Sequence, residues 1–111
     1  MTLIDYSSSQ LTANRLERLA QLVRKQQVSD VMARTLEKLF EMEREESLRL
    51  MQQIQADLTE FEEQYGMSSE EFYRQWQAGE TDDRMDFVEW ASLIQMRENA
   101  KERLALLESE F

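Results

Sequence analysis

The residues that interrupt helices are confined to one short part of this chain. The sequence contains no proline, and both of its glycines, Gly66 and Gly79, lie in residues 65–90 together with both tryptophans. Glycine adopts the left-handed conformation of a helix C-terminus without a Cβ clash, so Gly66 is expected to end a long helix. Because helix formers dominate much of the remaining chain, the sequence predicts an almost entirely α-helical fold.

A short helix over residues 69–77 is predicted between the two glycines. Ser68, with Glu71 three residues on, forms a capping box whose side chains satisfy free backbone N–H groups at a helix start. Gly79 ends this helix, and a second N-cap follows at Thr81, Asp82 and Asp83. A helix this short is not stable alone. Its aromatic residues must therefore be buried on a neighbouring helix or on a partner; they are Phe72, Tyr73 and Trp76.

Two longer helices are predicted to flank the short one. Residues 29–64 contain no helix breaker, which favours one continuous helix of roughly 50 Å. Its second half carries a heptad-like apolar stripe of Leu50, Met51, Ile54, Leu58, Phe61 and Tyr65. The last helix, over 84–108, is apolar nearly all round in its first turns, which is typical of burial on more than one side. We therefore expect a C-terminal helical hairpin, with residues 84–107 antiparallel to 47–64.

Residues 1–45 are predicted to form a separate unit. The β-branched and aromatic residues of 2–7 favour one short strand, 7–10 a loop, and Thr12 or Asn14 an N-cap. Ser29 caps the following helix. Both helices carry an apolar face at helical spacing, formed by Leu16, Leu19, Ala20, Leu22, Val23, Val31, Met32, Leu36, Leu39 and Phe40. These faces exceed what one hairpin can hide, so we expect a homodimer through this unit.

This N-terminal order also resembles the ribbon-helix-helix DNA-binding domain. The resemblance is carried by Ser29, Asp30, Val31, Met32 and Leu36 at the start of the second helix. It implies that two chains pair their strands and that the ribbon enters the major groove of operator DNA. The DNA-facing residues would then be Leu3, Asp5 and Ser7, with phosphate contacts from Arg15, Arg18, Arg24 and Lys25. An ordinary helical hairpin with an ordered arm is the alternative.

Charge is distributed unevenly along the chain. Residues 1–40 carry six Lys/Arg and four Asp/Glu, whereas 41–111 carry seven and nineteen, for net charges of +2 and −12. The acidic part should repel nucleic acid and membranes and attract a basic protein, although solubility alone would also explain it. The absence of cysteine, of a signal-peptide pattern and of a 20-residue apolar run favours a cytoplasmic protein with no membrane contact.

The central stretch resembles small antitoxins of prokaryotic type II toxin–antitoxin pairs. The matching residues are 61–73, then Gly79, Glu80 and Asp83, then 86–90. The resemblance implies an acidic helical module, here residues 46–111, that binds and silences a basic protein toxin, often an RNase. Taken with the charge and the aromatic residues, it predicts toxin contacts at Phe72, Tyr73, Trp76, Asp83, Asp86, Phe87, Glu89 and Trp90. For both tryptophans, burial in the core is the other interpretation, and it is favoured for Trp90.

The residues that usually carry catalysis or bind metals are scarce. The chain has no histidine and no cysteine, which removes the commonest general base, nucleophile and zinc ligands. Carboxylates alone can hold Mg²⁺ or Ca²⁺, and a cluster is formed by Asp82, Asp83, Asp86 and Glu89. Acids at a helix N-terminus are explained equally well by capping. We therefore expect no metal, no cofactor and no enzyme activity.

Two functions of different classes follow from the sequence. The first is an antitoxin that neutralises a toxin with residues 46–111 and dimerises with residues 1–45, for which the ribbon-helix-helix resemblance also implies binding to its own operator. The second is a non-enzymatic coiled-coil adaptor that binds neither DNA nor a toxin. A small basic reading frame beside this one would distinguish them.

Overall fold

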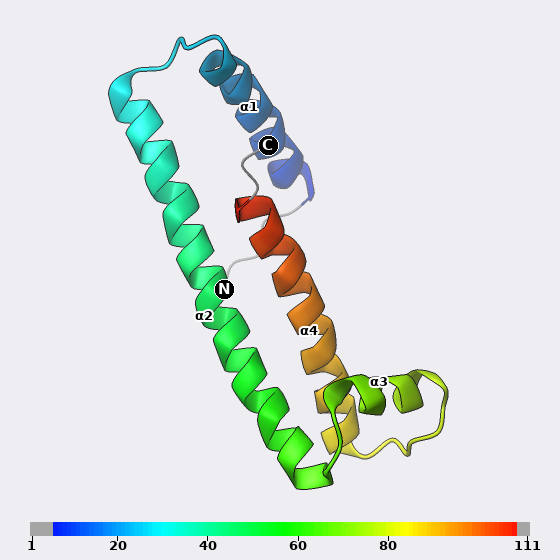
Figure 1. Ribbon diagram of the computed structural model, residues 1–111. Helices are drawn as coiled ribbons and strands as arrows, with labels where there is room; N and C mark the ends of the chain where they lie inside the picture. The colour runs from blue at the N-terminus through cyan, green and yellow to red at the C-terminus, as the bar shows by residue number, and fades with distance from the viewer. Residues whose placement is uncertain (1–5, 109–111) are drawn as a thin grey trace. The chain divides into compact units, whose positions relative to one another are not determined.

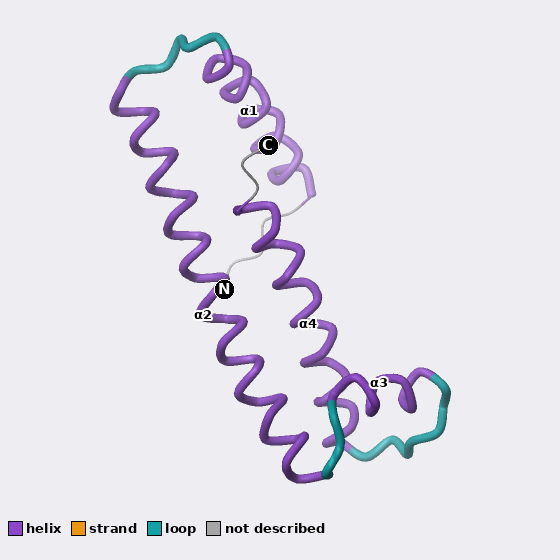
Figure 2. Tube along the Cα trace, viewed as in Figure 1, coloured by secondary structure: helices purple, strands orange, loops and turns teal. Residues whose placement is uncertain are grey.

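The computed structural model describes residues 6–108, and all regular secondary structure in this range is helical (Figures 1 and 2). The four helices are α1 (Tyr6–Arg24), α2 (Asp30–Tyr65), α3 (Ser69–Gln77) and α4 (Met85–Glu108). The all-α prediction is confirmed for this part of the chain. The helices predicted over 29–64, 69–77 and 84–108 are present, and α2 is continuous.

The start of the chain departs from the prediction. Residues 2–5 of the expected strand, including Leu3 and Asp5, lie outside the described range. Tyr6 and Ser7 belong to α1, which begins six residues before Thr12, so the loop predicted over 7–10 is wrong. Serine is only modestly less favourable in a helix than leucine, and no glycine or proline separates these serines from the apolar residues that follow. The helix can therefore extend backwards through them.

The chain divides into two compact units, residues 1–39 (the N-terminal unit) and 40–111 (the C-terminal unit). Helix α2 begins in the first and continues in the second. The roles predicted for 1–45 and 46–111 remain predictions.

The N-terminal unit consists of α1, a tight turn and the first turns of α2. Gln26 takes the left-handed conformation (φ 56°), and its backbone N–H donates to the Val23 carbonyl at 2.9 Å. Ser29 Oγ then accepts from the Met32 backbone N–H at 3.1 Å, which confirms the predicted cap. Of the residues 8–39, none is buried. The most covered side chains are half-buried: Leu19, Ala20, Val28 and Leu36.

In the C-terminal unit, local signals set the ends of the short helix as predicted. Gly66 (φ 64°) follows α2 and Gly79 (φ 72°) follows α3. Ser68 Oγ accepts from the Glu71 backbone N–H at 3.1 Å. The other half of the expected capping box is replaced, because the Glu71 carboxylate accepts from the Arg74 guanidinium at 2.7 and 3.1 Å.

Helices α2 and α4 run antiparallel in the C-terminal unit, and α3 crosses one end of the pair (Figure 1). Phe61 stacks on Trp90 with ring centroids 5.6 Å apart, and towards the other end Arg44 donates to the Glu108 carboxylate at 3.0 Å. The core lies between the three helices and consists of Ile54, Leu58, Phe72, Trp90, Ala91, Leu93, Ile94 and Ala100. The predicted hairpin is thus observed.

Candidate functional site

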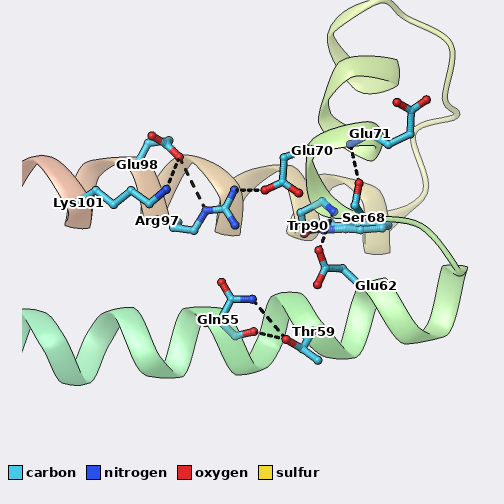
Figure 3. A network of polar contacts seen from close by, with 11 residues as sticks. Gln55, Thr59, Glu62, Ser68, Glu70, Glu71, Trp90, Arg97, Glu98 and Lys101 are labelled. Atoms are coloured by element: carbon cyan, nitrogen blue, oxygen red, sulfur yellow. Dashed lines mark hydrogen bonds and ion pairs between the residues drawn. The ribbon is translucent and has the colours of Figure 1, made fainter.

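Trp90 is the point at which the three helices of the C-terminal unit meet. Its ring is fully buried and lies flat on Phe72, with centroids 4.0 Å apart and an interplanar angle of 1°. Its indole Nε1–H donates to Ser69 Oγ at 3.0 Å, inside the core. The Ser69 backbone N–H in turn donates to the Glu62 carboxylate at 2.7 Å, and Figure 3 shows Glu62 of α2 extending towards Trp90. This chain of bonds fixes α3 on both long helices.

A second polar group closes the same end of the unit. The Tyr65 hydroxyl donates to Asp86 Oδ2 at 2.5 Å, which raises the pKa of Tyr65. The Arg84 guanidinium lies 4.6 Å from the centroid of the Phe87 ring and donates twice to the Asp82 carboxylate, at 2.7 and 2.9 Å. These bonds, with one from the Arg84 backbone N–H, lower the pKa of Asp82 from 3.8 to about 2. The start of α4 is thus held by the Tyr65–Asp86 hydrogen bond and by the ion pair between Arg84 and Asp82.

The residues predicted to contact a toxin fall into three groups. Phe72 and Trp90 are 1% and 0% exposed, so their rings form the support of this surface and not its outer layer. The partly buried group is Tyr73, Trp76, Asp86 and Phe87, and the exposed group is Asp83 and Glu89. The structure brings together the rings of Phe72, Trp76, Phe87 and Trp90.

Several residues of the site were not among the predicted contacts. Tyr65 and Arg84 pair with the predicted Asp86 and Phe87, and Gln95 accepts from the Tyr73 hydroxyl at 2.8 Å. The Arg97 side chain is only 13% exposed and donates to Glu70 of α3 at 3.3 Å (Figure 3). The sequence signal was available for Tyr65, which belongs to the heptad-like stripe. The other pairings depend on which helices meet, and sequence spacing does not supply that.

The outer side of α4 corrects one expectation. The first turns of this helix were expected to be buried on more than one side, but Met85 and Val88 are exposed, as are Met96 and Leu106 further along. Within the described part of the C-terminal unit, residues 40–108, these four side chains remain exposed. The nearly continuous apolar pattern therefore combines one core-facing side with an apolar side that is open.

The candidate DNA contacts lie in the N-terminal unit. Arg15, Arg18 and Arg24 are exposed on α1, and Lys25 is exposed in the turn that follows. Ser7 is helical rather than part of a strand, and Leu3 and Asp5 lie outside the described residues. Four cations are thus accessible to phosphate, while the paired ribbon of the resemblance remains a prediction.

Residues 6–108 contain neither a metal-binding group of carboxylates nor a membrane-spanning helix. There, no group of three or more Asp or Glu side chains is placed to hold a metal ion. Two of the four carboxylates in the predicted cluster have protein partners, since Asp82 pairs with Arg84 and Asp86 accepts from Tyr65. None of the four helices has the length and apolarity needed to cross a bilayer.

Comparisons with known proteins add no relative to this description. No protein-family model, no curated protein and no solved structure matches the chain. The two resemblances given above therefore rest on their motif residues, and the geometry described here is independent of them.

The C-terminal unit is expected to lose stability in acid through Glu71. Hydrogen bonds from Arg74 and then Gln75 lower the pKa of Glu71 from 4.5 to about 2. Because the pKa is depressed in the folded state, this contribution is complete above pH 4.5 and is lost as the pH falls towards 2. The effect should be modest, since the pair is solvent-exposed.

Urea denaturation of Glu71→Gln at neutral and acidic pH measures this contribution. The variant should lose less stability than the wild type between about pH 4.5 and pH 2. The matched control is Glu63→Gln on α2, an exposed carboxylate that accepts no hydrogen bond from the described residues. Equal acid sensitivity of the Glu71 variant and the wild type would contradict the assignment.

Proposed function

We propose that this protein is a non-enzymatic antitoxin, whose C-terminal unit binds and silences a basic protein toxin and whose N-terminal unit joins two copies. The observation that carries the proposal is the net charge of −12 on residues 40–111, a compact unit with its own core. The antitoxin class and an RNase as its target both come from the motif resemblance, and the acidic surface is compatible with a basic RNase.

Most of the acidic charge in the C-terminal unit is not neutralised within the unit. Between residues 40 and 108, ion pairs engage six carboxylates: Glu46, Glu70, Glu71, Asp82, Glu98 and Glu108. The other acids leave a surface that repels phosphate and accelerates encounter with a basic protein. A nucleic-acid ligand for this unit is therefore disfavoured, and a cationic protein is favoured.

Dimerisation is supported by the exposed apolar side chains of the N-terminal unit. Leu11, Leu16, Leu22, Val23, Val31, Met32 and Leu39 all remain exposed, and Val31 is 68% exposed. A unit this small with no buried residue between 8 and 39 gains little from burial of its own apolar surface. A second copy of the same unit would cover these faces symmetrically.

Replacing Leu16 and Leu39 with glutamate should therefore convert the protein to a monomer. Burying two charges in the interface costs several kcal/mol, so we expect the dissociation constant to rise by more than about 100-fold. Sedimentation equilibrium at micromolar concentration measures it. The control is Leu106→Glu, at a side chain that is 81% exposed in the C-terminal unit, which should leave the dimer intact. A monomeric wild type would refute this part of the proposal.

The function itself is tested by co-expression with the product of the neighbouring reading frame, which an antitoxin predicts to be a small basic protein. An antitoxin should co-purify with that protein and restore growth to cells that the protein alone arrests. If the neighbouring protein is harmless and does not bind, the adaptor function remains and the antitoxin proposal is wrong.

A further inference from the structure

A small cavity opens beside the aromatic cluster of the C-terminal unit. Its volume is about 230 Å³, and it lies between the end of α2, α3 and the loop that leads to α4. The rings of Tyr65, Phe72, Phe87 and Trp90 line one part, and Glu80 and Asp82 line another. Pockets that hold whole small molecules measure about 300 Å³ or more. The size therefore fits one side chain of a partner better than a metabolite.

The electrostatics of the cavity favour a cation. Residues 80–86, which run along its edge into α4, contain four carboxylates and one basic residue, Arg84. The charge of Arg84 is balanced by Asp82, with which it forms two hydrogen bonds. The Glu80 side chain is exposed and accepts no hydrogen bond from any described residue. Glu80 does feel one nearby cation, since the pKa of Arg74 is raised chiefly by its hydrogen bonds to Glu71 and to a smaller extent by the charge of Glu80. A positively charged group entering the cavity would thus meet a carboxylate at its edge that has no hydrogen-bond donor among the described residues.

Arg84 also shows which cation these rings accept. Its guanidinium lies 4.6 Å from the Phe87 centroid and 6.0 Å from the Tyr65 centroid. A planar guanidinium can stack on an aromatic ring while it donates two parallel bonds to a carboxylate, which an ammonium group cannot do. The same two rings line the cavity, and the carboxylates of its lining are Glu80 and Asp82.

We propose that this cavity binds one arginine side chain of the basic partner, with the guanidinium against the aromatic lining of the cavity and hydrogen-bonded to Glu80. The inference rests on the proposed function for the source of the arginine, but the site can be tested without the partner. It adds to the predicted contacts a defined anchor, since Glu80 and Tyr65 were not among them.

The probe is Nα-acetyl-arginine amide, titrated into the full-length ¹⁵N-labelled protein and followed by amide and indole shifts. Saturable shifts should be centred on Glu80, Thr81 and the Trp90 indole N–H, whose ring lines the cavity. The corresponding citrulline amide has nearly the same shape but no charge and should not saturate. Equal responses to the two amides, or no response to arginine, would overturn the proposal.

Glu80→Gln should raise the dissociation constant of the arginine amide about threefold to fivefold. Glu102→Gln removes the same charge from an exposed position on α4 that does not line the cavity, and it should leave binding unchanged. An equal rise of the dissociation constant in both variants would show that only the net charge of the protein matters, and it would overturn the site. Arginine binding that occurs only after Arg84→Ala would also overturn it, because Arg84 would then be the occupant. Failure of the partner to bind would refute the proposed function and leave these outcomes unaffected.

Discussion

Trp90→Ala should unfold the C-terminal unit or leave it only marginally stable. The side chain is completely buried, stacks on Phe72 and Phe61, and donates the hydrogen bond that ties α4 to Ser69. Removing a buried aromatic ring from a core costs about 3–5 kcal/mol, and the orphaned Ser69 hydroxyl adds to that cost. Total stabilities of small domains are about 5–15 kcal/mol, so the loss is a large share.

Thermal and urea unfolding, followed by helical circular dichroism, measure this loss. Trp76→Ala is the matched control, because Trp76 is only partly buried and lies at the edge of the same cluster, with its ring centroid 6.0 Å from Phe72. We expect a much smaller loss of stability for the Trp76 variant and nearly unchanged helix content. A Trp90 variant as stable as the Trp76 variant would show that the cluster does not hold the unit together.

The fold was predictable where local chemistry decides it. Gly66 ends α2, and the Ser68 cap and Gly79 set the two ends of α3; these signals act over a few residues. The absence of breakers in 29–64 predicted α2. The start of α1 was missed because a polar run that lacks glycine and proline is compatible with either loop or helix.

The candidate site was predictable only in part, because its pairings depend on tertiary contacts. Asp86 was expected as a surface acid, but its partner is Tyr65, twenty-one positions earlier and on another helix. Burial is similarly non-local: Phe72 lies in the core while its neighbour Tyr73 is half-buried and donates to Gln95 of α4. The cavity could not be inferred at all, since residues of α2, α3, α4 and the loops between them form it.

Partner binding should be lost completely when the C-terminal unit is interrupted. A chain that ends at Gln64 lacks α3 and α4. It therefore lacks Trp90, the Phe72 ring on which Trp90 stacks, and most of the carboxylates that form ion pairs. It should fail to neutralise the toxin and still dimerise, because the apolar faces of residues 16–39 are retained. Residues 40–111, which have their own core, should fold as a monomer and bind the partner without the N-terminal unit.

Binding of residues 40–111 to the product of the neighbouring reading frame, measured by calorimetry at low and high salt, tests the central claim most directly. We predict a stable complex with a 1:1 stoichiometry, whose association weakens as salt screens the acidic surface. Binding by the chain that ends at Gln64, with none by residues 40–111, would contradict the account.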